Sequence, residues 1–143
     1  MNTNLSNALD IPNTLVAQAE TQAGKTRDYR LTRDDDLDLA FTGWKVAEGR
    51  CGDREHESDW TRWTIVRLYV TTGGRFVVGI ERHSRWQGST SRYDAVAHET
   101  FDDVLLYLKD DNDGRVGTAS KAMVEDAVAN LDCLGRADVE QIG

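Results

Sequence analysis

The stretch that decides the fold is residues 60–98, WTRWTIVRLYVTTGGRFVVGIERHSRWQGSTSRYDAVAH. Its first part, Trp60 to Thr71, has apolar residues at both odd and even positions, which is typical of an interior strand. The Gly73-Gly74 pair supplies the positive φ angles of a tight hairpin turn, and a return strand is predicted from Arg75 to about Trp86. A second turn leads into a strand over residues 92–98. The sequence therefore predicts an antiparallel meander.

Two further strands are predicted ahead of this meander, over residues 28–32 and Leu39–Glu48. Alternation in the second strand separates two faces, with Trp44 and Val46 on one and Phe41, Gly43 and Lys45 on the other. In the return strand the inward side chains are expected to be Phe76, Val78 and Ile80, and the outward ones Arg75, Val77, Gly79, Glu81 and His83. The polar run from Arg50 to Asp59 lacks an apolar period, so we expect an exposed acidic loop there.

Helical patterns flank the strands. Ile11-Pro12-Asn13 is expected to open a short helix in an N-terminal arm, residues 1–27, and Gly24 to end it. Thr100 and Asp103 resemble a capping box, and apolar residues follow at helical spacing: Phe101, Val104, Leu105 and Leu108. A second helix opens at Thr118 or Ser120, with the stripe Val124, Ala127, Val128 and Leu131.

Strands followed by helices indicate an α+β fold. We expect an antiparallel meander sheet of four to five strands covered by two C-terminal helices, with the N-terminal helical arm beside it. Residues 28–143 would form a single domain, which agrees with a total length of 143 residues.

The net charge of −8 argues against a protein that coats nucleic acid through overall attraction. The charge is nevertheless segregated along the chain. Residues 60–93 hold six Arg and one Glu, a net charge of +5, whereas residues 1–59 carry −5 and residues 94–143 carry −8. The average therefore conceals a basic meander between acidic flanks.

Several classes of site are not indicated. The N-terminal residues 1–15 resemble neither a secretory signal nor a membrane span, so we expect a cytoplasmic protein. Cys51 and Cys133 have no metal-ligand spacing, and we expect both to be reduced and Cys133 to be a small core residue. The Asp-rich turn at residues 110–114 fails as a calcium loop, because its register puts a lysine at the first ligand position.

No catalytic motif is present: the chain has no phosphate loop, dinucleotide fingerprint, nucleophile elbow or HExxH. His83 and His98 lie on neighbouring predicted strands and could approach each other, and Cys51 could pair with a histidine. Surface or half-buried histidines are the simpler interpretation. We expect no enzyme, no cofactor and no metal site.

Two surfaces are candidates for binding a partner. Around the turn at residues 87–91, arginines and a tryptophan form a patch of the kind enriched at interfaces or stacked on nucleotides: Arg82, Arg85, Trp86 and Arg92. Acidic clusters could instead occupy a nucleic-acid-binding site on another protein: Asp34, Asp35, Asp36, Asp53, Glu55, Glu57 and Asp59. Such clusters are more often merely solvated surface, and the arginines more often pair with carboxylates.

Three segments, LTRDDDL at 31–37, FTGW at 41–44 and residues 62–78, resemble small accessory proteins of bacterial plasmids and integrative elements. The resemblance covers roughly residues 28–131, and no functional residue can be carried over. It implies an anti-CRISPR or antirestriction protein that inhibits host defence by binding a complex that handles nucleic acid. The alternative is a nucleic-acid-binding accessory or regulatory protein that uses the Arg-rich sheet edge. The oligomeric state is left open.

Overall fold

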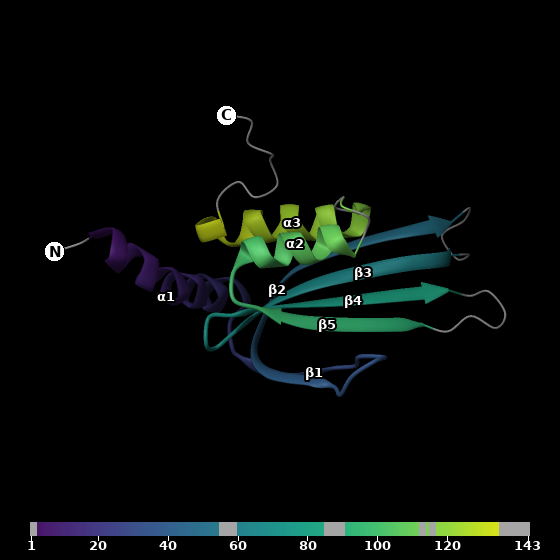
Figure 1. Ribbon diagram of the computed structural model, residues 1–143, viewed down its shortest axis with the longest axis horizontal. Coiled ribbons are helices and arrows are strands. Elements are labelled where there is room, and N and C mark those ends of the chain that lie inside the picture. Colours follow the sequence, from purple (N-terminus) through teal and green to yellow (C-terminus); the bar gives the residue numbers. More distant parts are fainter. Residues whose placement is uncertain (1–2, 55–59, 85–90, 112–113, 115–116, 135–143) are drawn as a thin grey trace, which may run out of the picture.

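The computed structural model describes residues 3–54, 60–84, 91–111, 114 and 117–134. Its elements in chain order are α1 (Thr3–Ala23), β1 (Arg27–Leu31), β2 (Leu39–Arg54), β3 (Trp60–Thr71), β4 (Phe76–Ser84), β5 (Arg92–His98), α2 (Phe101–Asp110), α3 (Thr118–Asn130) and a short 3-10 helix, η1 (Asp132–Leu134). The strands form one antiparallel sheet in the order β1-β2-β3-β4-β5. Figure 1 shows this sheet with α2 and α3 above it. The predicted α+β class is confirmed.

Two predicted boundaries are wrong. Helix α1 begins at Thr3 rather than at Ile11. Pro12 lies inside this helix, whose backbone continues through it although an interior proline removes one helical hydrogen bond. Strand β2 continues to Arg54 through part of the predicted loop, because its backbone pairs with β3 down to Arg54↔Trp60. Pairing with a strong neighbouring strand has overridden the polar local sequence.

A β-bulge in β2 adapts the sheet to α3. The register shifts between Lys45 and Ala47, so both Val46 and Ala47 are buried. Asn130 Nδ2 of α3 donates to the Val46 carbonyl at 2.8 Å, and the Glu48 amide donates to Asp126 Oδ2 at 3.0 Å. The helix therefore satisfies backbone groups that the bulge removes from the strand ladder.

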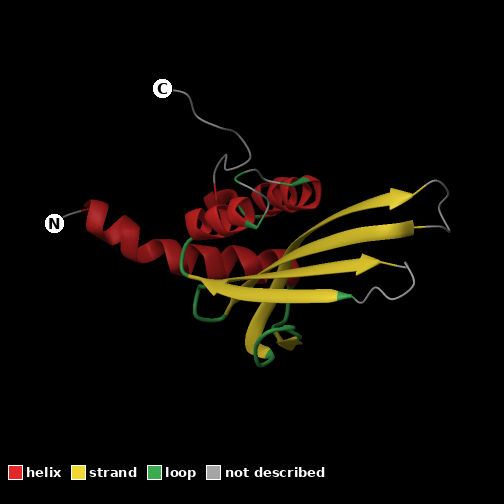
Figure 2. Ribbon diagram, turned by 45° about the vertical axis from the view of Figure 1, so that its right-hand side comes forward, coloured by secondary structure: helices red, strands yellow, loops and turns green. Residues whose placement is uncertain are grey.

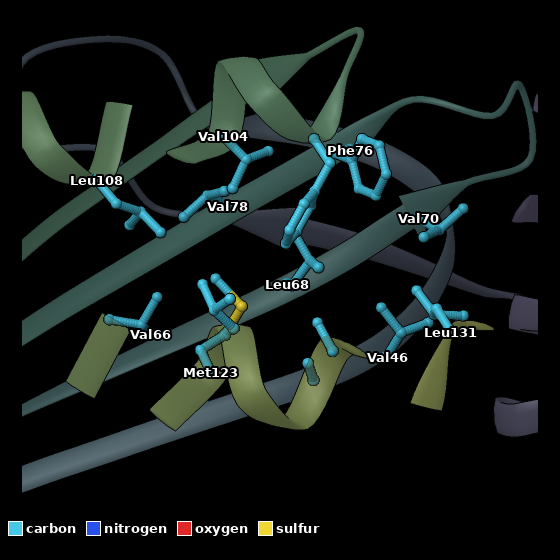
Figure 3. Close-up of a cluster of buried hydrophobic side chains, with 14 of the residues drawn as sticks. Val46, Val66, Leu68, Val70, Phe76, Val78, Val104, Leu108, Met123 and Leu131 are labelled. Atoms are coloured by element: carbon cyan, nitrogen blue, oxygen red, sulfur yellow. The ribbon is translucent and has the colours of Figure 1, made fainter. Parts of the chain in front are cut away.

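The main core lies between one face of the sheet and the helices. Figure 3 shows Val66, Leu68 and Val78 of the sheet facing Leu108 of α2 and Met123 of α3. All five side chains are almost fully buried. Figure 2 shows the helices gathered on this one side of the strands. The predicted inward residues Phe76, Val78 and Ile80 all belong to this core.

The opposite face of the sheet is not open, contrary to our expectation for Val77, Gly79 and Phe41. The sheet curls so that β1 lies on the side away from the helices (Figure 1). Leu31 Cδ1 of β1 comes within 3.4 Å of the position that a Cβ on Gly79 would take, and Val77 is buried. Tyr29 packs against Phe41 and Tyr69 with ring centroids 5.3 and 4.8 Å apart. A second, aromatic core therefore fills the curl.

No helix within the described part of the chain combines the length and the apolar composition needed to cross a membrane.

Candidate functional site

The connection between β1 and β2, residues 32–38, is called here the acidic loop. Its first acid is fixed to the edge of the sheet. The Asp34 amide donates to the Tyr93 carbonyl at 3.1 Å, and Asp34 Oδ2 accepts from the Tyr93 amide at 2.9 Å. Because β5 is the edge strand, these two bonds cap its exposed backbone at one position. They also anchor the acidic loop to the far strand of the sheet.

The rest of the acidic loop is ordered by its own side chains. Arg33 Nε donates to the Leu37 carbonyl at 2.6 Å, and the Leu37 amide donates to Asp36 Oδ1 at 2.7 Å. Arg30 of β1 pairs with Asp38 at 2.9 Å. The result is that Leu37 projects from the loop with 81% of its surface exposed, between two aspartates. The acidic loop therefore has an apolar tip, Leu37, with an aspartate on each side.

A groove of about 620 Å³ separates the acidic loop from the helix side of β5. Its lining brings together five of the predicted partner-binding residues, Asp34, Asp35, Asp36, Arg82 and Arg92. Residues of both predicted clusters, the acidic one and the Arg-rich one, thus line the same groove. Folding joins them because Asp34 pairs with the strand that carries Arg92.

Two arginines of the Arg-rich segment are neutralised by ion pairs. Arg82 makes an ion pair with Asp111, which follows α2. Arg67 makes ion pairs with Glu48 and Glu81. Arg92 is exposed and makes no ion pair with another described residue. The +5 segment is therefore a set of internal pairs with a few exposed arginines rather than a continuous basic surface.

The remaining predicted residues are not placed at this groove. Asp53 stands near the end of β2, opposite Arg62 in the register with β3. Five of the predicted partner-binding residues lie outside the described part of the chain: Glu55, Glu57, Asp59, Arg85 and Trp86.

Three cations surround Glu48 on the face away from the helices. Burial, the largest single influence, raises its pKa, but hydrogen bonds from Arg50 and Arg67 and the nearby Lys45 outweigh burial and lower the pKa to about 2. Arg50 Nε and Arg67 Nε each lie 2.8 Å from a carboxylate oxygen of Glu48. The carboxylate therefore stays ionised and links β2 to β3.

Sequence reasoning missed a hydrogen-bonded row beside this cluster. His83 Nε2 lies 3.0 Å from Glu81 Oε1, and its Nδ1 lies 2.8 Å from Ser91 Oγ. Trp63 stacks on the imidazole at 5.0 Å. The order serine, histidine, carboxylate resembles a catalytic relay. However, Glu81 also makes an ion pair with Arg67, so its negative charge is shared between His83 and Arg67. The row therefore acts as a structural link between neighbouring strands.

His83 and His98, which the sequence allowed to approach each other, lie far apart. His83 pairs with Trp63 on β3, whereas His98 pairs with Phe76 at the other end of β4, about 23 Å away at the usual rise of a strand. The His98 ring packs against Tyr107 in a tilted arrangement, with centroids 5.2 Å apart, and burial, the largest influence, lowers the pKa of the imidazole. Cys51 packs against the helix-side core, away from His83.

Cys133 is partly buried and packs against the core, and this burial raises the pKa of its thiol. Among the residues that the structure describes, no group of three His, Cys, Asp or Glu side chains is placed to hold a metal ion.

Comparison of the chain with protein-family models, with curated proteins and with solved structures gives no match.

Proposed function

We propose that this chain is a non-catalytic protein-binding inhibitor, encoded by a bacterial mobile element, that blocks a host defence complex acting on nucleic acid. The acidic loop is the docking element. The observation that carries the proposal is Leu37, 81% exposed between Asp36 and Asp38 on a loop tied to β5. The mobile-element context comes from the resemblance of residues 28–131 to plasmid accessory proteins.

The chemistry of the acidic loop favours a basic partner surface. Sites that hold nucleic acid are rich in Lys and Arg, and a row of aspartates complements them electrostatically. An exposed leucine at the centre supplies apolar area that becomes buried in the complex, which charges alone do not provide. Such a loop can occupy the place of a nucleic acid strand on the partner.

Pre-organisation supports the same assignment. The hydrogen bonds from Asp34 to Tyr93 and from Arg33 to Leu37 hold the loop before any partner arrives. Binding then costs less conformational entropy than ordering an unstructured acidic segment.

The alternative, direct nucleic-acid binding by the Arg-rich sheet edge, has less support. Arg82 is committed to Asp111, and Arg92 faces a groove whose other wall holds Asp34, Asp35 and Asp36. Phosphate groups approaching this edge would meet those carboxylates.

The test combines capture and function. Tagged protein expressed in a host with an active restriction or CRISPR system is expected to recover a nucleic-acid-binding complex and to reduce immunity against phage or plasmid. Leu37→Ala should weaken capture by roughly 10- to 100-fold, since a fully buried leucine contributes about 1.5–3 kcal/mol. Asp35→Lys should weaken it as well, by charge reversal in the loop.

Matched controls exist elsewhere on the surface. Leu106 of α2 is also exposed, at 59%, so Leu106→Ala removes similar apolar area away from the loop. Glu125→Lys reverses an exposed charge on α3. Equal effects of Leu37→Ala and Leu106→Ala, or recovery of no such complex together with unchanged immunity, would refute the proposal.

A further inference from the structure

A second groove, of about 300 Å³, lies where the end of α1 meets β1 and β2. It is called here the basic groove, and it is lined by Gln22, Ala23, Lys25, Arg27, Tyr29, Trp44 and Lys45. All three charged residues of its lining are cations. In a chain with a net charge of −8, this local composition is the reverse of the average.

The cations of the basic groove are largely uncompensated. Lys25 and Arg27 are exposed and make no ion pair with another described residue. Lys45 Nζ lies 3.6 Å from Glu48, but that carboxylate already accepts from Arg50 and Arg67 at 2.8 Å each. Because Arg50 and Arg67 lie closer to Glu48 than Lys45 does, this carboxylate compensates the charge of Lys45 only in part.

The nearest acids in sequence do not line the groove. Asp28 follows Arg27 on β1 and accepts a hydrogen bond from Thr42 Oγ1. Glu20 stands on α1 just before Gln22 and is exposed.

The frame that carries these cations is rigid. Gly24, with φ +82°, ends α1 and turns the chain directly into β1. Trp44 Nε1 of β2 donates to the Gly24 carbonyl at 2.7 Å, and the indole is buried. This bond fixes the turn between Gln22 and Arg27 against the sheet. The backbone that carries the cations is therefore held in place, and ligand binding has to order only their side chains.

The groove is distant from the acidic loop. The two features lie at opposite ends of β1, so Arg27 and Leu31 are about 13 Å apart at the usual rise of a strand. That separation exceeds the screening length of about 10 Å at 0.1 M salt. An anion at the groove consequently feels the three cations more strongly than the acidic loop.

We propose that the basic groove binds the phosphate groups of a single-stranded nucleic acid. Lysine and arginine donate charge-assisted hydrogen bonds to phosphate oxygens, and Arg27 can do so with two N–H groups at once. Tyr29, whose ring packs against Phe41 and Tyr69, also lines the groove and makes part of its wall aromatic. Three cations are too few for the extended contact that a duplex needs. The proposal does not depend on the acidic loop binding a protein.

The test is fluorescence anisotropy of a labelled single strand of about 20 nucleotides with the full chain, at about 50 and 200 mM salt. For three phosphate contacts on a single strand, a plot of the logarithm of the binding constant against the logarithm of the salt concentration has a slope of about −2. Affinity should therefore fall roughly 20-fold between the two salt concentrations. The variant Lys25→Gln/Arg27→Gln/Lys45→Gln should lose at least about tenfold in affinity and most of the salt slope.

The matched control is Arg62→Gln/Arg75→Gln/Lys121→Gln, which removes three exposed cations outside the basic groove. It should change affinity less than about twofold. Thermal unfolding of both variants, expected to match the original chain, separates lost binding from lost folding. Similar losses in both triple variants, or no binding up to about 100 μM protein at 50 mM salt, would overturn the proposal.

Competitors distinguish the sources of negative charge. An unlabelled strand should displace the label, whereas a mononucleotide, inorganic phosphate or poly-glutamate at equal charge concentration should not. Displacement by the mononucleotide would mean that the ligand is a nucleotide, and displacement by poly-glutamate would mean that it is an acidic peptide. Either result overturns the proposal. Failure of this test leaves the capture experiment on Leu37 unaffected, because the two sets of variants do not overlap.

Discussion

The close approach of α3 to β2 makes Gly49→Ala a severe test of the fold. A Cβ at Gly49 would lie 2.0 Å from the Ala119 carbonyl oxygen and 2.4 Å from the Met123 amide nitrogen. Both are backbone atoms of α3, so no side-chain rotation relieves the clash. Ordinary contact begins near 3.4 Å, and α3 would therefore have to retreat by about 1.4 Å.

The cost follows from what α3 buries. Met123 and Val124 are almost fully buried, and each contributes about 1.5–3 kcal/mol. A gap of about 1 Å forfeits up to half of such contacts. The hydrogen bonds that join Asn130 to Val46 and Glu48 to Asp126 would stretch, at about 1 kcal/mol each. The expected loss in the free energy of unfolding is about 3–5 kcal/mol, a large part of the total for one domain.

Urea denaturation followed by tryptophan fluorescence measures this loss. Gly79→Ala is the control, because its Cβ would lie 3.4 Å from Leu31 Cδ1, the end of a flexible side chain, and should shift stability by less than about 1 kcal/mol. A Gly49→Ala variant that loses under about 1 kcal/mol, or a Gly79→Ala variant that loses as much, would refute the close packing of α3 on β2.

Two further predictions concern the charged groups. The folded-state pKa of Glu48, about 2, lies below the usual value of 4.5, so its contribution to stability is present above pH 4.5 and is lost as the pH falls toward 2. Glu48→Gln should therefore remove part of the fall in unfolding free energy between pH 4.5 and 2. The control Glu125→Gln, at an exposed site, should leave that pH dependence unchanged. Identical curves of stability against pH for both variants would contradict the lowered pKa of Glu48. Asp34→Ala should speed hydrogen exchange at the Tyr93 amide by roughly fivefold, because one hydrogen bond contributes about 1 kcal/mol. Asp34→Asn, which retains an acceptor oxygen, should exchange more slowly than Asp34→Ala, and equal protection in all three proteins would mean that the acidic loop is not anchored there.

The candidate sites were predictable only in part. The acidic loop stood out because four of the five residues from Asp34 to Asp38 are aspartates, and Arg82 and Arg92 because they belong to a basic segment. Their meeting at one groove depends on the curl of the sheet, which local patterns do not encode. The basic groove was missed because its cations come from a helix end and two strands and form no cluster in the sequence.

The sequence by itself determined the order of the strands and helices and the helix-facing side of the meander. Alternation and helical spacing are local, and they identify Phe76, Val78 and Ile80 and the buried positions of α2 without knowledge of distant residues. Only the tertiary structure decided the rest. The length of β2 came from pairing with β3, and the burial of Val77 came from β1 folding across the second face. The position of the acidic loop came from the bonds of Asp34 to Tyr93, 59 residues away. Each of these features depends on contacts between segments that are far apart in the chain. Such contacts form only when the whole curled sheet assembles, so local sequence patterns do not reveal them.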